Sequence, residues 1–190
     1  MGVTLSYYMI RSIADRNILD DFTIDFCSIV EKYCKYIIVS RFVAISSGRT
    51  RATEDIAMII SRLPIDEFKK VHLDLLKSGF VCVQSDDVTE IYSYLNENTS
   101  VRYTYENEPL PEMEVKFVKD MLDEVQIDSR VKLELTGLDI WFSNIEMNLA
   151  FKEELLKSDK DLKDAEHLRK IYDVHEEKVL EYKELIKRYR

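Results

Sequence analysis

The segment that decides the fold is residues 36–60, which read YIIVSRFVAISSGRTRATEDIAMII. An apolar run over residues 36–39 ends at Ser40, a helix-compatible stretch follows to Gly48, and apolar, β-branched residues resume over 55–60. Two such runs, separated by a short helical stretch and a charged turn, predict the order strand, helix, turn and strand. This order places Ser40, at the end of the first strand, near the start of the second.

The order of these elements resembles the core of the nucleotidyltransferase superfamily, in particular its small prokaryotic and archaeal members of the toxin and antitoxin type. The core motif of that superfamily is a Gly-Gly or Gly-Ser pair that opens a helix, followed by Asp-x-Asp on the next strand. Here Ser40 and Arg41 stand in place of the pair, and Asp55-Ile56-Ala57 stands in place of Asp-x-Asp. The resemblance implies an α/β (α+β) fold, with a small mixed sheet flanked by helices, and a degenerate active site.

The second strand shows what has changed in the motif. Residues 55 and 57 share one face of a strand because side chains alternate. Two carboxylates there, with a third from a neighbouring strand, could hold the Mg²⁺ ions of an in-line displacement. Ala57 offers no oxygen, and Glu114 in the alternating segment 113–117 is the closest match to the third carboxylate. The resemblance implies Asp55 and Glu114 as catalytic and metal-binding residues of a weakened Mg²⁺ site, although Glu114 could equally be an exposed strand residue.

The resemblance also implies nucleotide-binding roles for polar residues around this core, which are Ser40, Arg41, Arg51, Thr53, Lys152 and Asp161. The side chain of Arg41 hinders the close backbone approach that glycine allows, although its guanidinium could itself hold a phosphate. Lys152 and Asp161 belong to residues 143–168, which resemble the segment in which a lysine and a K-D-x-x-D turn close over the substrate. We expect Arg41, Arg51 and Lys152 to converge on one cleft.

Apolar periodicity and capping residues divide the remainder of the chain. We expect an α/β unit over residues 1–142 and a helical region over residues 143–190 that packs on it. The predicted elements are a helix that starts at Asp21, a helix between Pro64 and Gly79, strands over 80–83 and 101–105, a helix from Asp87, a strand over 113–117, a hairpin of residues 131–135 and 138–142, and helices from Ser143 to the end.

Composition limits the classes of partner. The 36 acidic and 27 basic residues give a net charge of −9, which argues against a general affinity for nucleic acid. No apolar run approaches the roughly 20 residues of a membrane span. Three cysteines, an odd number without a signal peptide, indicate free thiols and a cytoplasmic location.

Three functions remain open from the sequence. The first is a catalytically impaired protein of nucleotidyltransferase fold that retains a cleft for a nucleoside triphosphate or another anion. The second is an active enzyme in which Glu54 or Glu112 completes the metal site, although Glu54 should face the other side of its strand. The third is an antitoxin-like interaction protein that binds a partner or a second copy through residues 174–190.

Overall fold

The structure is a computed structural model that describes residues 16–50 and 53–190. Its centre is a five-stranded mixed sheet of order β1-β2-β5-β4-β3. The strands are β1 (Tyr36–Val39), β2 (Asp55–Ile60), β3 (Phe80–Cys82), β4 (Val101–Tyr105) and β5 (Glu112–Phe117). Only β2 and β5 pair in parallel, so the predicted mixed sheet is confirmed.

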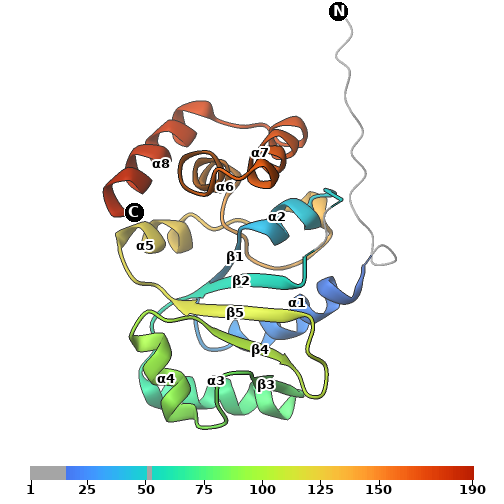
Figure 1. The fold of residues 1–190 in the computed structure, drawn as a ribbon, viewed down its shortest axis with the longest axis vertical. Helices are drawn as coiled ribbons and strands as arrows, with labels where there is room; N and C mark the ends of the chain where they lie inside the picture. Colours follow the sequence, from blue (N-terminus) through green and yellow to red (C-terminus); the bar gives the residue numbers. More distant parts are fainter. Residues whose placement is uncertain (1–15, 51–52) are drawn as a thin grey trace, which may run out of the picture.

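Helices cover both faces of the sheet (Figure 1). One layer consists of α1 (Ile18–Val30), α3 (Ile65–Lys77) and α4 (Val88–Asn96), which lie over the apolar sides of β2 and β5. The other layer consists of α2 (Arg41–Ser46), α5 (Met121–Asp128), α6 (Ile145–Phe151), α7 (Asp159–Ile171) and α8 (Glu176–Tyr189). A π-helical turn, η3 (Lys152–Leu156), extends α6, so the C-terminal part of the chain is helical as predicted.

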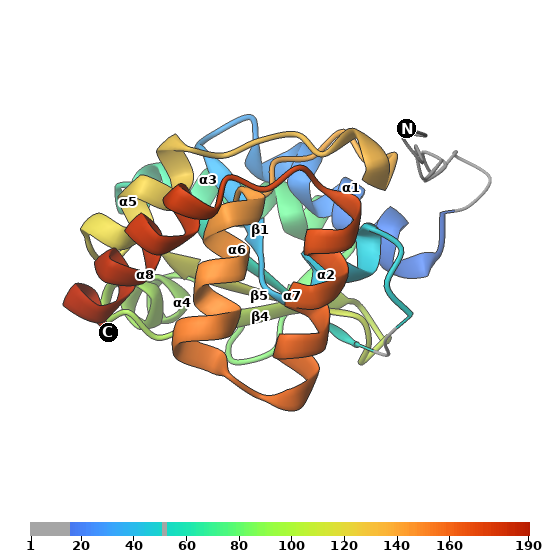
Figure 2. The same ribbon diagram turned by 90° about the horizontal axis from the view of Figure 1, so that it is seen from above.

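The two faces of β5 show how the alternating sequence sorts into the two layers. Met113, Val115 and Phe117 are buried in the main core, whereas the residues between them, Glu114 and Lys116, face the other layer and are half-buried. Successive side chains of a strand point to opposite faces, which explains this division. Figure 2 shows α5, α6, α7 and α8 lying over that second face.

The sequence favours strands over 36–40 and 55–60 at the centre of the sheet, but β1 is the edge strand beside β2, and only β2 is internal, with β5 on its other side. The starts of two helices also differ from the sequence-based expectation. The first helix begins at Ile18 instead of Asp21, since Asn17 caps it and Asp20 completes a capping box. The cap of α6 is Asn144 and not Ser143, because the Asn144 side chain accepts the amide hydrogen bond of Met147.

The predicted hairpin of residues 131–142 does not form. A 3₁₀ turn, η2 (Glu134–Thr136), occupies its first half and ends at Gly137 with φ 66°. Phe142 then bridges to Val131 on one side and to Ile38 of β1 on the other. The Phe142 N–H and C=O bond to Val131, whereas the Trp141 C=O and the Ser143 N–H bond to Ile38, so residues 141–143 pair with the edge of β1 instead of continuing a hairpin.

Helix α5, which the sequence analysis missed, packs against β1, β2 and α8. Its signal was the N-cap Asp120, whose side chain accepts the amide hydrogen bonds of Leu122 and Asp123.

The predicted two-unit division at residues 142 and 143 stays a prediction. Among the residues described, no helix combines the length and the apolar character needed to cross a membrane.

The three cysteines are free, as predicted. Burial raises the pKa of the Cys27 thiol, and burial raises the pKa of Cys34 to about 12. A neutral, buried thiol is a poor nucleophile. Both side chains therefore act as small apolar groups.

Candidate active site

The candidate site lies on the face of the sheet that α2 partly covers. Ser40, Arg41, Asp55, Ala57 and Glu114 line a cavity of about 160 Å³, which we call the Asp55 pocket. Asp55 and Ala57 come from β2, and Glu114 comes from the adjacent β5, directly opposite Ala57. Strand alternation and strand register together place the predicted catalytic pair in one pocket.

Ser40 keeps the backbone geometry of a glycine. Its φ of 69° and ψ of −128° lie in a region that L-residues with a side chain rarely adopt. The chain must turn there between β1 and the first residue of α2, Arg41. The serine that stands in place of the motif glycine is thus strained by about 1–3 kcal/mol.

The Asp55 pocket has two carboxylates where three would be expected. Within residues 16–50 and 53–190, no group of three or more His, Cys, Asp or Glu side chains is arranged to hold a metal ion. Glu112 lies opposite Asp55 in the register, but its carboxylate is 3.5 Å from Nε of Arg102. Ala57 therefore leaves an apolar methyl group at the centre of the site.

Two other predicted residues have different surroundings. Thr53 donates a hydrogen bond from Oγ1 to the backbone oxygen of Asp55, 3.2 Å away, and so supports the start of β2. Arg51 lies outside the described residues, so its predicted position in the cleft stays a prediction.

Lys152 and Asp161 belong to a buried ionic cluster instead of lining the Asp55 pocket. The Lys152 side chain is 1% exposed, and its Nζ lies 3.2 Å from Oδ2 of Asp164 and 3.7 Å from Oδ1 of Asp161. Arg49, just after α2, completes the cluster with its Nε 2.7 Å from Oδ1 of Asp164. These contacts join α2, η3 and α7.

A second cavity, of about 210 Å³, lies beside the Asp55 pocket and shares Ser40 with it. We call it the Lys116 cavity; its lining residues are Val39, Ser40, Ile59, Lys116, Gln126, Ser143, Asn148, Phe151, Lys152, Leu155, Leu156 and Arg190. Ile59 and Lys116 lie on the same sheet face as Ala57 and Glu114. Lys152 is thus above the same face as Asp55, but in the neighbouring cavity.

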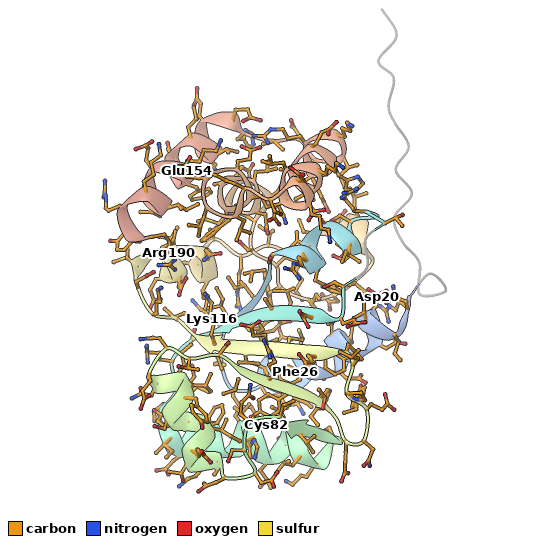
Figure 3. All side chains as sticks on the ribbon, viewed as in Figure 1. Asp20, Phe26, Cys82, Lys116, Glu154 and Arg190 are labelled. Atoms are coloured by element: carbon orange, nitrogen blue, oxygen red, sulfur yellow. The ribbon has the colours of Figure 1, made fainter. Side chains whose placement is uncertain are left out.

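Burial lowers the pKa of the Lys116 ammonium, although the charges of Asp123 and Asp120 act in the opposite direction. Both acidic residues pair with Arg190, which extends from the end of α8. Figure 3 shows Arg190 above Lys116 on the same side of the molecule. The sequence analysis did not assign a role to Lys116 or Arg190. It did not predict α5, whose N-cap Asp120 and first-turn residue Asp123 are the acidic neighbours of both side chains.

Comparison with solved structures identifies the fold. The structure is similar to that of the antibiotic-resistance factor ANT(2'')-Ia in solution, with a TM-score of 0.50 and 12% sequence identity over 90% of this chain and 94% of that chain. It is also similar to the crystal structure of an antigenic nucleotidyltransferase-like protein from Paracoccidioides brasiliensis, with a TM-score of 0.49 and 18% identity over 78% of this chain and 75% of that chain. No protein-family model and no curated protein sequence matches the chain.

The chain therefore has the nucleotidyltransferase fold, as the sequence analysis expected. The toxin and antitoxin type stays a prediction. At these identities the likeness concerns the fold alone, and the chemistry has to be argued from the side chains of the site.

Proposed function

We propose that the protein binds the phosphate groups of a nucleoside triphosphate, or a related phosphate anion, in the Asp55 pocket and does not transfer the nucleotidyl group. The observation that carries this proposal is the pairing of Ala57 with Glu114 across β2 and β5, on the face that also presents Asp55. A carboxylate at position 57 would lie between the other two. Its absence removes the ligand that a two-metal displacement needs at the centre of the site.

The residues present fit one weakly bound Mg²⁺ better than two. Mg²⁺ commonly takes one or two carboxylates and fills its remaining positions with water and substrate phosphates. Asp55 and Glu114 can supply those carboxylates, and Arg41 can supply a positive charge to a phosphate. We therefore expect Mg²⁺ to strengthen triphosphate binding, because the ion offsets the two carboxylates, but to strengthen it less than it would at a site with three carboxylates.

A second candidate is an active nucleotidyltransferase with a rearranged set of carboxylates. One observation favours it: Glu112 lies opposite Asp55 on the same face of the sheet. Its carboxylate would have to leave Arg102 to reach a metal. Glu54 is a weaker choice, because it immediately precedes Asp55 and alternation directs it to the other face.

Calorimetric titration with nucleoside triphosphates, with and without Mg²⁺, tests the proposal together with a nucleotidyl-transfer assay. We expect binding that Mg²⁺ strengthens, and no transfer. Arg41→Gln should weaken binding, whereas Arg62→Gln, an exposed arginine that bonds to Asn96 and Asn98, is the matched control. Mg²⁺-dependent transfer that Asp55→Ala abolishes would support the active candidate, and absence of triphosphate binding would reject the proposed function.

The interaction candidate depends on α8. Its apolar stripe consists of Val179, Tyr182, Ile186 and Tyr189. Val179 and Ile186 are buried, and Tyr182 accepts a hydrogen bond from Asn144. Tyr189 is the stripe residue that stays exposed, at 36%. Most of the stripe is thus used within the chain, so measurement of the mass in solution is the first test of a dimer.

A further inference from the structure

The Lys116 cavity combines an apolar lining with a lysine that forms no ion pair within the described part of the chain. Val39, Ile59 and Phe151 contribute apolar walls from the sheet and from α6, and Leu155 and Leu156 contribute further walls from η3. Among the residues that the structure describes, no hydrogen bond or ion pair engages the Lys116 ammonium. A cation in such surroundings gains from an anionic partner that brings its own apolar surface.

The other charged groups of the cavity are already paired. Lys152 contacts Asp161 and Asp164. Arg190 contacts Asp120 and Asp123, and its Nη2 lies 3.0 Å from Oδ1 of Asp123. The unmatched charge of this cavity, within the described part of the chain, is thus the single positive charge of Lys116, which suits a monoanion better than a triphosphate.

One acceptor in the cavity is also without a donor. The Asn148 amide nitrogen donates to the backbone oxygens of Ser143 and Asn144, at 2.8 and 2.9 Å. These two bonds use the amide nitrogen and fix the orientation of the side chain, so Oδ1 is its free acceptor. No described residue donates a hydrogen bond to this oxygen. A ligand with a hydroxyl group could satisfy this acceptor.

The volume limits the size of the ligand. A cavity of about 150 Å³ with apolar walls is large enough for benzene. The Lys116 cavity, at about 210 Å³, has room for one ring and a small polar group. It is too small for the ligands that fill pockets of about 300–1,000 Å³.

We propose that the Lys116 cavity binds a small aromatic carboxylic acid, with the carboxylate on Lys116 and the ring against Ile59 and Phe151. This site is separate from the Asp55 pocket, although Ser40 borders both. The proposal does not depend on nucleotide binding, since none of its contacts involves Asp55 or Glu114.

Titration with benzoate, and with toluene as the uncharged analogue without a hydrogen-bond donor, tests the site. We expect saturable binding of both probes and tighter binding of benzoate. A charge-assisted hydrogen bond makes a difference of at least about tenfold, so Lys116→Met should weaken benzoate binding by that factor and change toluene binding little. The matched control is Lys119→Met, because Lys119 is exposed and does not line the cavity.

A second pair of variants keeps the test independent of how well Lys116→Met folds. Leu155 is 42% exposed and lines the cavity, so it tolerates a polar replacement. Leu155→Glu should weaken benzoate binding more than toluene binding through charge repulsion, whereas Leu155→Gln should affect both probes alike. The proposal is wrong if neither probe binds saturably, if both bind the unaltered protein equally, or if Leu155→Glu and Leu155→Gln have the same effect on benzoate.

Discussion

At the scale of single residues, the proposed function depends on Ala57. This residue is two positions after Asp55 on β2 and opposite Glu114 on β5. Each 1.4 kcal/mol of lost transition-state stabilisation lowers a rate about tenfold, so under this proposal the loss of one metal ligand is expected to lower transfer by orders of magnitude.

The first prediction concerns repair of this position. Ala57→Asp should create a three-carboxylate site and make triphosphate binding strongly dependent on Mg²⁺, as measured by calorimetry at fixed nucleotide concentration. Ala57→Asn, of the same size without the charge, is the control and should gain no such dependence. Equal behaviour of the two variants would show that residue 57 is not the missing metal ligand. If Ala57→Asp gains the Mg²⁺ dependence without transfer, Arg41→Gly can be added to let the backbone approach the phosphates.

The strain at Ser40 gives the second prediction. Ser40→Gly should raise the free energy of unfolding by about 1 kcal/mol, because glycine adopts the φ of 69° freely while losing more entropy on folding. Urea denaturation measures the change. Ser40→Ala keeps the Cβ and should bring no gain. A stabilisation by alanine as large as that by glycine would mean that the hydroxyl group, and not the backbone, is the cause.

The third prediction concerns His72, a buried residue of α3. Its Nδ1 lies 2.9 Å from the Tyr103 hydroxyl, and burial lowers its pKa below the ordinary 6.5. The unfolded chain then binds more protons than the folded protein below pH 6.5, so the free energy of unfolding should fall as the pH falls through that value. Urea denaturation between about pH 7.5 and 5.5 measures the slope. His72→Leu should reduce the slope, and an unchanged slope would assign it to other groups.

At the scale of elements, the ionic cluster of Lys152 connects the C-terminal helices to the sheet. Asp164 of α7 is fully buried and forms ion pairs with Lys152 of η3 and with Arg49, which follows α2. The same junction includes a hydrogen bond of 2.8 Å between the hydroxyls of Ser47 and Tyr172. Removal of Lys152 or Arg49 takes one charged partner away from the buried Asp164 carboxylate. Such a loss lowers the free energy of unfolding more than the loss of a surface ion pair does.

The fourth prediction compares two lysines of one segment. Lys152→Met should lower the free energy of unfolding by about 1.5–3 kcal/mol, because Asp164 loses one charged hydrogen-bond partner in the interior but keeps Arg49. Lys157→Met, which removes an exposed lysine paired with Glu154 at 3.6 Å, should change it by less than about 1 kcal/mol. Thermal and urea denaturation provide the values. Similar losses in both variants would contradict a special role for the buried cluster.

At the scale of the whole molecule, α8 completes the layer of helices over the sheet. It packs on α6, and its last residue, Arg190, reaches α5 through Asp120 and Asp123. This arrangement makes α8 part of the folded core. An additional part in self-association stays a prediction.

The fifth prediction follows from that packing. A chain truncated after residue 173 should lose at least about 3–6 kcal/mol, because Val179 and Ile186 each contribute about 1.5–3 kcal/mol by burial. Such a loss approaches the whole stability of an ordinary domain. Leu180→Gln, at a position 61% exposed, is the control and should change stability little. If truncation changes only the mass in solution and not the melting temperature, α8 serves association instead.

The sequence by itself determined which local elements form around the site. The apolar runs that flank residues 40–54 specified β1 and β2, the alternation of 113–117 specified β5, and Pro64 with Gly79 bounded α3. These signals are local, because side-chain periodicity reports which face of an element is buried. These signals gave the order of strands and helices that resembles the nucleotidyltransferase core, and the fold confirms that resemblance.

Tertiary structure alone decided what the elements meet. It placed β1 at the edge of the sheet, where Phe142 forms bridges to Ile38 and Val131 in place of the expected hairpin. It also buried Lys152 against Asp164 instead of leaving it over the Asp55 pocket. It also brought Lys116 into one cavity with residues of α6, of η3 and with Arg190 after α8, which are distant from it in the sequence. Such contacts depend on which distant segments share a face, and the free energy of those contacts is not encoded in the periodicity of any one segment.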